Sequence, residues 1–432
     1  MPPSAHRHFG DSPPALTGLI GVACLIGLIF MWPVGLKTGT LLAFILFLSL
    51  LFFIMLAADF SAGVGRQIAF RPFRPRPFSR DDIQRLGHKF IGLTAITIFL
   101  VCFYSIAPIY QDVWYQRFLQ PTFSYLPALF CAVYIYIVAA DYLLQNPQDG
   151  LSDLGRAIIY AELPDDRHRL NNFLSGVLVK AFFLPLMFGY GLDDWIYFQT
   201  VVIVIENFRD IFEFIYRFLF FIDVVFAIIG YATASRLLGS QVRLTEHTFR
   251  GWVVCVICYA PFWQIIGRNY LDYGNDIVWG TFFAESPVLY MVWGTLILLV
   301  IATYVSATVL FGIRFSNLTY RGTIWRGPYA LVRHPAYLCK MTSYAMISLP
   351  FLGHSLPEIA ANIAAFSCVG AIYAARAWHE EKCCSRAREY RLYLRYMQRY
   401  GILERAFRHY GRRARRQRSG LTRSVAGSQG RY

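Results

Sequence analysis

The chain has 432 residues, of which 56% are hydrophobic and 17% aromatic, while only 16% are charged. A soluble globular protein carries about a quarter charged residues, and a disordered chain is far less apolar, so both classes are excluded. With 9 cysteines the chain is also too poor in sulfur for a scaffold held together by disulfides. The composition therefore predicts an integral membrane protein, although the formal net charge is +15.

Apolar runs recur along the chain at lengths suited to membrane helices, since a bilayer core about 30 Å thick is crossed by roughly 20 helical residues. The candidate spans are Ala15–Pro33, Gly39–Ala57, Phe90–Ile109, Phe123–Ala140, Phe173–Tyr190, Phe218–Ser235, Trp252–Ile266, Val288–Ile313, Leu338–Gly353 and Pro357–Tyr373. Only residues 354–356 separate the last two, which predicts a helical hairpin. The predicted fold class is all-α, a polytopic transmembrane bundle of about eight to ten spans with this hairpin near its C-terminal end.

The basic residues indicate an orientation, because Lys and Arg concentrate in cytoplasmic loops. If the N-terminus is cytoplasmic, 35 of the 41 basic residues fall on the cytoplasmic side. The predicted outer loops then hold only Lys37, Arg117, Arg209 and Arg268. We therefore expect both termini in the cytoplasm and contact with anionic lipid of the inner leaflet. The same charge bias favours the inner membrane of a bacterium, and no folded basic module indicates a nucleic-acid partner.

Two charged residues lie inside predicted spans, Lys180 in the fifth and Asp223 in the sixth. Charges in hydrocarbon usually face a partner or a cavity. They are expected either to pair with each other or to line a substrate cavity or proton path, and the second reading keeps a transporter as an alternative. Cys255 and Cys258 have a metal-like spacing, but no second pair accompanies them in this apolar run, so no metal is predicted. No disulfides are predicted either.

The most informative stretch follows the eighth predicted span. Residues 327–329 read Gly-Pro-Tyr, and residues 333–337 read Arg-His-Pro-Ala-Tyr. Gly-Pro favours a turn at the point where the chain meets the membrane. The predicted hairpin comes next, and residues 376–381 then read Arg-Ala-Trp-His-Glu-Glu. Because a hairpin returns the chain to its starting side, cationic, aromatic and acidic side chains are expected to converge at a lipid boundary.

This arrangement resembles the isoprenylcysteine carboxyl methyltransferase family and its phospholipid methyltransferase relatives. Gly-Pro-Tyr, Arg-His-Pro-x-Tyr, a helical hairpin, a Glu-Glu pair and a Tyr-rich helix occur in that order over about residues 290–403. One departure is Cys339, which stands where the family usually has Gly, and Lys340 follows it. The resemblance implies an integral membrane enzyme that uses S-adenosylmethionine at a cytoplasmic cofactor site and methylates a lipidic or isoprenoid-like acceptor, with carboxylates among the candidates.

The resemblance also implies roles for particular residues. The expected cofactor-binding residues are Tyr329, Arg333, His334, Tyr337, Glu380 and Glu381. The chemistry of the side chains suits these roles, because a glutamate binds an ammonium or ribose hydroxyls and an arginine binds a carboxylate. His334 is expected to form a hydrogen bond or to act as a base. Arg333 and Arg376 are the predicted catalytic residues, of which Arg376 is the second candidate for binding the acceptor anion.

Two alternatives stay open. The Arg-His-Pro-x-Tyr pattern also resembles membrane sterol reductases that use NADPH, but those typically have Asn at the position of Ala336 and lack the Glu pair. The other alternative is a transporter or a non-catalytic membrane scaffold, since residues 1–280 form an N-terminal membrane region of unknown role. The methyltransferase-like region is predicted to be 281–403, followed by a basic disordered tail at 404–432.

The segment after the Glu pair has tyrosines at 390, 393, 396 and 400 and arginines at 388, 391, 395 and 399. Both sets follow helical spacing. This pattern predicts an interfacial helix with an aromatic and a basic stripe, ended by Gly401. An anchor at the lipid headgroups is the favoured interpretation, and a lid over the cofactor is the alternative.

Overall fold

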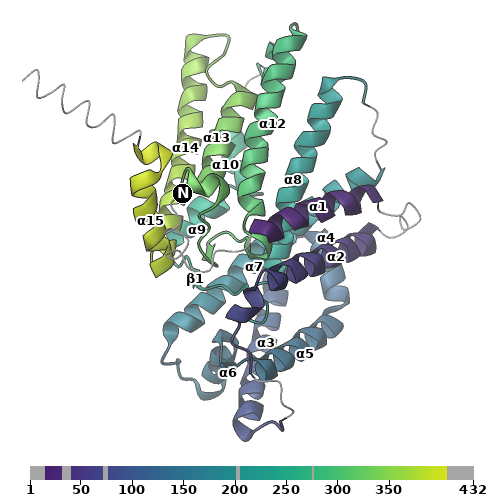
Figure 1. The fold of residues 1–432 in the computed structure, drawn as a ribbon, viewed down its shortest axis with the longest axis vertical. Helices are drawn as coiled ribbons and strands as arrows, with labels where there is room; N and C mark the ends of the chain where they lie inside the picture. Colours follow the sequence, from purple (N-terminus) through teal and green to yellow (C-terminus); the bar gives the residue numbers. More distant parts are fainter. Residues whose placement is uncertain (1–14, 32–39, 72–75, 201–204, 275–276, 406–432) are drawn as a thin grey trace, which may run out of the picture.

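The computed structural model describes residues 15–31, 40–71, 76–200, 205–274 and 277–405. This part of the chain is almost entirely helical, with one short pair of antiparallel strands, in agreement with the predicted all-α class. Two helical groups extend in opposite directions from a middle layer that contains β1 and its neighbouring loops (Figure 1). The predicted tail at 404–432 lies outside the described residues except for its first two positions.

The described helices and strands have the following bounds. The first half contains α1 (Ala15–Met31), α2 (Thr40–Ser61), η3 (Val64–Gln67), α3 (Arg80–Ile106), η4 (Pro108–Gln111), α4 (Val113–Ser124), α5 (Leu126–Leu143), α6 (Gly150–Tyr160), α7 (Arg167–Thr200) and α8 (Phe208–Ala232). The second half contains β1 (Leu244–Thr245), α9 (Phe249–Val256), α10 (Phe262–Tyr270), α11 (Trp279–Phe282), α12 (Pro287–Val309), η5 (Gly312–Arg314), β2 (Thr319–Tyr320), η6 (Gly327–Ala330), α13 (Pro335–Ser348), α14 (Leu356–Cys384) and α15 (Arg388–Tyr400).

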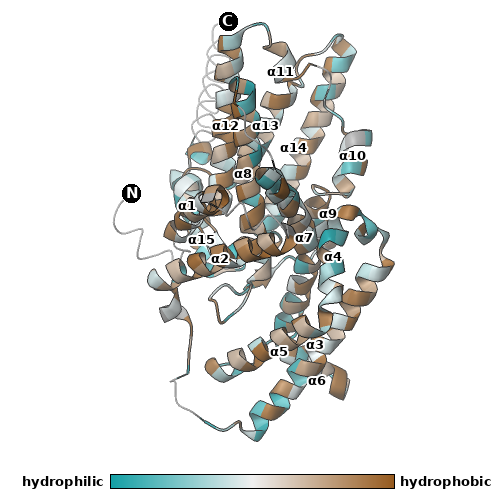
Figure 2. Cartoon of the chain, turned by 90° about the vertical axis from the view of Figure 1, so that its right-hand side faces the viewer, coloured by the Kyte–Doolittle hydropathy of each residue, from teal (hydrophilic) through white to brown (hydrophobic). Residues whose placement is uncertain are grey.

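Among the described residues, 6 helices are long and apolar enough to cross a membrane: α2, α3, α5, α7, α12 and α14. The helix α1 is apolar as well, but shorter. Hydrophobic residues cover long stretches of α2 and α12 (Figure 2). The chain is therefore an integral membrane protein, as the composition predicts, but the described residues hold fewer helices of membrane-spanning length than the predicted eight to ten.

The prediction of one span at Trp252–Ile266 is wrong, because the structure divides this run into α9 and α10. Residues 257–261 separate the two helices, each of which is far shorter than roughly 20 residues. Pro261 explains the break, since a proline supplies no backbone N–H and its ring is incompatible with the interior of a helix.

The predicted hairpin is confirmed as α13 and α14, but its second arm is longer than the apolar run suggests. The helix α14 continues past Tyr373 to Cys384, so Glu380 and Glu381 lie in its last turns and do not start a new helix. The charged residues from Arg376 onward are compatible with this extension, because Glu, Lys and Arg are good helix formers.

The two strands bring distant loops together. Leu244 pairs with Tyr320 and Thr245 with Thr319 in antiparallel register. A further backbone bond joins the Glu246 N–H to the carbonyl of Leu318 over 2.9 Å. This ladder fixes the loop after α8 against the loop after α12, which carries the conspicuous sequence motifs.

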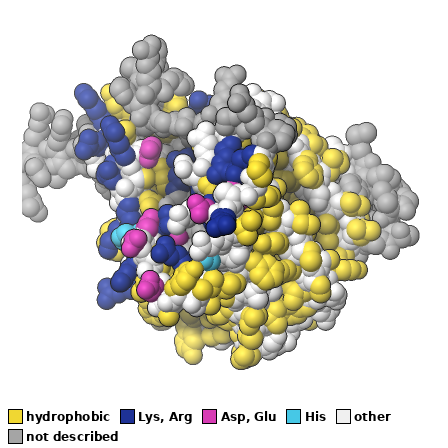
Figure 3. Space-filling model, turned by 90° about the horizontal axis from the view of Figure 1, so that it is seen from below, with side chains coloured by type: hydrophobic (Ala, Val, Ile, Leu, Met, Phe, Trp, Pro, Cys, Tyr) yellow, Lys and Arg dark blue, Asp and Glu magenta, His cyan; other side chains and the backbone are white. Residues whose placement is uncertain are grey.

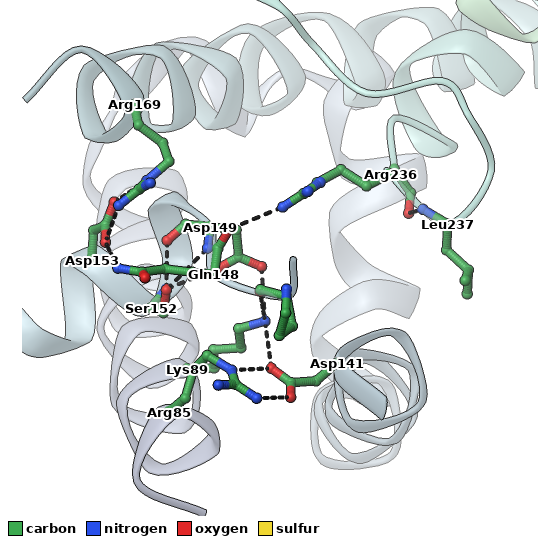
Figure 4. A network of polar contacts seen from close by, with 12 residues as sticks. Arg85, Lys89, Asp141, Gln148, Asp149, Ser152, Asp153, Arg169, Arg236 and Leu237 are labelled. Carbon is green, nitrogen blue, oxygen red and sulfur yellow. Dashed lines mark hydrogen bonds and ion pairs between the residues drawn. The ribbon is translucent and has the colours of Figure 1, made fainter. Parts of the chain in front are cut away.

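Buried ion pairs hold the N-terminal helices together (Figure 4). Lys89 of α3 is almost completely buried, and its Nζ lies 2.9 Å from Asp141 Oδ2 of α5 and 3.0 Å from Asp149 Oδ2. Arg236, in the loop after α8, donates from Nη1 to the carbonyl of Gln148 over 2.9 Å. These bonds compensate charges that would be costly to bury alone, and they connect the N-terminal helices to the middle layer.

One face of the molecule carries a patch of charged side chains. Figure 3 shows basic and acidic side chains interspersed over one part of this face, while hydrophobic side chains cover much of the rest. Because the two signs are mixed there, the charges offer one another partners at short range.

Candidate functional site

The loop between α12 and α13 takes its shape from glycines. Gly312 has φ 54° and Gly327 has φ 57°, in the left-handed region that favours glycine. At Gly230 of α8, an added Cβ would collide with the backbone carbonyl of Phe315. The loop therefore lies directly on α8, and the turn predicted at Gly327-Pro328 is confirmed as η6.

Arg333, at the end of this loop, binds two carboxylates. Its Nη1 donates to both oxygens of Glu381 over 2.9 Å, and its Nε donates to Glu404 Oε1 over 2.6 Å. Partial burial acts to lower the pKa of Arg333, but the two glutamates outweigh it and raise that pKa above its usual value. Arg333 is therefore a fixed cation beside α14.

His334 and Tyr337 connect the first turn of α13 to the Glu pair. His334 Nε2 lies 2.9 Å from Glu381 Oε1, and the Tyr337 hydroxyl donates to Glu380 Oε2 over 2.6 Å. The two rings stack, with centroids 5.6 Å apart and an interplanar angle of 11°. The predicted convergence of the two motif clusters is thus confirmed, and each glutamate has its own partners.

Arg376 lies one helical turn before Glu380 on α14 and is buried. Its Nη2 donates to Asn317 Oδ1 over 2.8 Å and to the Tyr259 hydroxyl over 3.2 Å. The guanidinium also lies over the ring of Tyr337, at 5.1 Å from the centroid. Within the described part of the chain no carboxylate forms an ion pair with Arg376, so its charge is held by neutral oxygens and aromatic faces.

These side chains line one cavity of about 1020 Å³, counting its open mouth. Its charged lining residues are Arg314, Arg321, Arg333, Lys340, Arg376 and Glu380. Of the predicted site residues, Tyr329, His334 and Tyr337 also line the cavity. Glu381 lies behind this wall, bound to Arg333 and His334.

The motif tyrosine at 329 is covered by α15. The Tyr393 hydroxyl donates to the carbonyl of Tyr329 over 2.8 Å, and Tyr390 and Tyr393 line the cavity themselves. Burial raises the pKa of the Tyr329 phenol well above its usual range, and the charge of Glu380 adds to this effect. Tyr329 is therefore a neutral phenol at neutral pH. The buried face of α15 closes this side of the cavity, so the helix does more than anchor the chain at a lipid surface.

Arg321 is a cation that the sequence analysis did not single out. Its Nε donates to the carbonyl of Ser240 over 2.7 Å, and its Nη1 donates to the carbonyl of Gly230 over 2.7 Å. Burial, together with the charge of Arg314, lowers the pKa of Arg321 to about 9. Arg321 therefore fixes the loop between α12 and α13, called the cavity loop below, to the end of α8.

Lys180 and Asp223 do not pair with each other, so of the two alternatives the structure excludes the pairing. Asp223 accepts hydrogen bonds from the Tyr304 hydroxyl and Thr308 Oγ1 of α12, both over 2.5 Å. Lys180 donates instead to the carbonyl of Ala234 over 3.4 Å. The reason is the direction of each residue on its helix, since Asp223 faces α12 rather than α7. Tyr304 and Thr308 line the cavity, so Asp223 lies just behind its wall.

An apolar groove lies between α13 and α14 and adjoins the cavity. Its lining includes Leu338, Met341 and Ala374, and it shares Tyr337 and Tyr373 with the cavity. A polar pocket that meets an apolar groove suits a ligand with a polar head and a greasy tail. Cys339 is not among the residues that line either space.

The described residues contain no group of three or more His, Cys, Asp or Glu side chains arranged to hold a metal. Cys255 and Cys258 lie in and just after α9, where the Cys258 thiol donates to the carbonyl of Val254 over 3.4 Å. All 9 cysteines lie in the described part of the chain, and all are free thiols.

No family model, curated protein or solved structure matches the chain in sequence or structure comparisons. The function is therefore argued from the site alone. The sequence analysis did not identify Tyr259, Asn317 or Arg314 as site residues. No motif marks the first two, whereas the position of Arg314 just after an apolar run was a signal for a charged residue near the membrane boundary.

Proposed function

We propose that this protein is an integral membrane enzyme that transfers a methyl group from S-adenosylmethionine to a lipidic or amphiphilic acceptor at the cytoplasmic face. The observation that carries the proposal is the meeting of both motif clusters at one cavity beside an apolar groove. Arg333, His334 and Tyr337 approach from the start of α13, while Glu380 and Glu381 approach from the end of α14. The resemblance of these motifs to membrane methyltransferases supplies the reaction type.

The two glutamates are assigned different roles. Glu380 lines the cavity and, within the described structure, its side chain accepts one hydrogen bond, from Tyr337. Its other oxygen suits the ammonium or a ribose hydroxyl of the cofactor. Glu381 is already bound to Arg333 and His334, so it is a positioning residue that fixes those two side chains.

Arg376 suits an anion, either the carboxylate of the cofactor or an acidic group of the acceptor. It is buried, lines the cavity and is held by Asn317 and Tyr259, which are neutral. A preorganised guanidinium of this kind orients a carboxylate without a large loss of side-chain freedom. The predicted roles of Arg333 and Arg376 therefore separate, since Arg333 is neutralised by two glutamates and Arg376 is not.

S-adenosylmethionine, when bound, supplies an electrophilic methyl group on a sulfonium. The chain's task is then to orient donor and acceptor and to exclude water, because a carboxylate or phenolate acceptor needs no strong base. Tyr329, Tyr337 and Tyr373 give the cavity aromatic walls suited to a cation. The groove between α13 and α14 gives an apolar tail a way to the cavity from the side.

The experiment is a labelled-methyl assay on the full-length protein in lipid nanodiscs. Purified protein is incubated with S-adenosyl-[methyl-¹⁴C]methionine and a total membrane lipid extract, and the radioactivity in the organic phase is counted. We expect incorporation by the native protein and loss of it in Glu380→Gln. The matched control is Glu213→Gln, a carboxylate on α8 that is largely exposed and paired with Arg209. NADPH oxidation without methyl transfer would instead favour the reductase.

A further inference from the structure

Arg314 is a buried cation with an unused donor that lies in the wall of the cavity. It ends η5 and is 5% exposed. Its Nη2 lies 2.7 Å from Asp59 Oδ2, and its Nε donates to the carbonyl of Gly239 over 3.3 Å. Its Nη1 has no hydrogen-bond partner among the described residues. A buried N–H without an acceptor is uncommon in folded proteins, and Arg314 is one of the residues that line the cavity.

Asp59 holds this guanidinium in place from α2. Its side chain is completely buried, and it also accepts a short hydrogen bond from the hydroxyl of Thr17 on α1. The first two helices therefore reach the cavity through one carboxylate. That carboxylate orients Arg314 and leaves one edge of the guanidinium for a ligand.

Lys340 is a second cation in the same cavity wall. Its Nζ lies 5.2 Å from the ring centroid of Tyr304, and no ion pair or hydrogen bond of this ammonium occurs within the described structure. Tyr304 itself donates to Asp223, and that carboxylate also accepts a hydrogen bond from Thr308. The ammonium thus borders the cavity with three donors and no protein acceptor.

The cavity therefore has two kinds of lining. Glu380 and the aromatic rings of α13 and α14 suit a cation, whereas Arg314 and Lys340 offer donors to an anion. Arg321 adds a third positive charge on the side of the cavity loop. An anion bound there would accept a hydrogen bond from the free N–H of Arg314. It would also offset the charges of Lys340 and Arg321, which form no ion pair within the described structure.

We propose that Arg314 and Lys340 form a binding site for the anionic headgroup of an amphiphile, a carboxylate or a phosphate ester, and that Asp59 positions Arg314 for this contact. The substrate class of the enzyme is then an acidic lipid whose tail occupies the groove between α13 and α14. This inference rests on the proposed methyl transfer only for the statement that the amphiphile is the acceptor. It also gives α1 and α2 a part in the site.

The test measures ligand binding to the full-length protein in nanodiscs, with empty nanodiscs subtracted. The probe is ¹⁴C-dodecanoate, displaced by unlabelled dodecanoate, dodecyl phosphate, dodecanol or inorganic phosphate. The first variant is Lys340→Gln, which breaks no ion pair within the described structure. The second is the double variant Asp59→Asn/Arg314→Gln, which removes both buried charges together. The matched control is Arg395→Gln, an exposed arginine of α15.

We expect each variant to weaken dodecanoate binding by about tenfold or more, because a charge-assisted bond is lost. On the native protein, dodecyl phosphate should displace labelled dodecanoate at least as well as unlabelled dodecanoate does, and dodecanol should displace it poorly. Lys340→Arg should restore binding, and Arg395→Gln should leave it unchanged. Size-exclusion profiles and thermal unfolding of each variant show whether it is folded.

Three results would overturn the proposal: equal binding in native protein and both folded variants, equal competition by dodecanol, or competition by inorganic phosphate as strong as that by dodecyl phosphate. The last result would mean a site for a free anion. Binding of labelled S-adenosylmethionine is measured on the same samples. If the native protein binds no S-adenosylmethionine while dodecanoate binding is lost in the variants, the methyl transfer is refuted and the headgroup site is supported.

Discussion

Replacing each glutamate of the pair by glutamine separates their roles. Glu380 and Glu381 are neighbours in sequence, but only Glu380 lines the cavity. If Glu380 accepts a bond from the cofactor, Glu380→Gln removes a charged hydrogen bond, which contributes about 1.5–3 kcal/mol. The Kd for S-adenosylmethionine should therefore rise by roughly 10- to 100-fold. Thermal unfolding without ligand should change little, because Gln can still accept the hydrogen bond from Tyr337.

Glu381→Gln should act on stability first. The Arg333 and Glu381 side chains are 31% and 22% exposed, so their ion pair is neither fully exposed nor fully buried. Exposed pairs contribute about 0–1 kcal/mol, and breaking a buried pair costs about 3–5 kcal/mol. Because Glu404 still binds Arg333, we expect a loss of about 1–2 kcal/mol in the free energy of unfolding.

Equilibrium binding of labelled S-adenosylmethionine, together with thermal unfolding, measures both effects on the same nanodisc samples. Glu213→Gln serves as the control for loss of a surface carboxylate. The reasoning is refuted if Glu381→Gln weakens cofactor binding more than Glu380→Gln does, or if neither variant changes it.

Three further predictions concern the framework of the site. Asp59→Asn leaves buried Arg314 without its counter-charge and should lower the free energy of unfolding by about 3–5 kcal/mol, which chemical denaturation measures; a change under 1 kcal/mol would contradict it. Gly230→Ala should push the cavity loop off α8, cost about 1–3 kcal/mol and weaken cofactor binding, whereas Gly27→Ala, which meets nothing within 4 Å, should do neither. Lys89→Met should destabilise the N-terminal helices, seen as faster amide exchange in α3 and α5, and leave the cofactor Kd unchanged; a large change in that Kd would show that the ion-pair network extends to the site.

The part of the site that could be predicted from the sequence is the part built by local connection. Arg333 and Glu381 are 48 residues apart, but a single hairpin joins them, so their meeting follows from the order of the elements. The partners of Arg376 could not be predicted in this way. Tyr259 lies 117 residues before it and reaches it only because α9 packs against α14.

The wrong predictions have a similar origin. An apolar run marks a segment as buried in protein or lipid, but it does not determine which face of a helix meets which neighbour. Hydropathy therefore leaves a pair of Lys180 and Asp223 open as one alternative, although their helices turn them toward different partners. Pro261 was a readable signal for the break between α9 and α10, and the hydropathy of Trp252–Ile266 concealed it.

The most direct test of the central claim is transfer of a labelled methyl group from S-adenosylmethionine to lipid by the purified protein in nanodiscs. The proposed function predicts organic-phase radioactivity that grows with time and enzyme concentration. It also predicts a decrease of at least about tenfold in Glu380→Gln, in proportion to the lost charged bond. The claim is contradicted if folded native protein transfers no label to any fraction of a total lipid extract. It is also contradicted if Glu380→Gln transfers label as well as the native protein does.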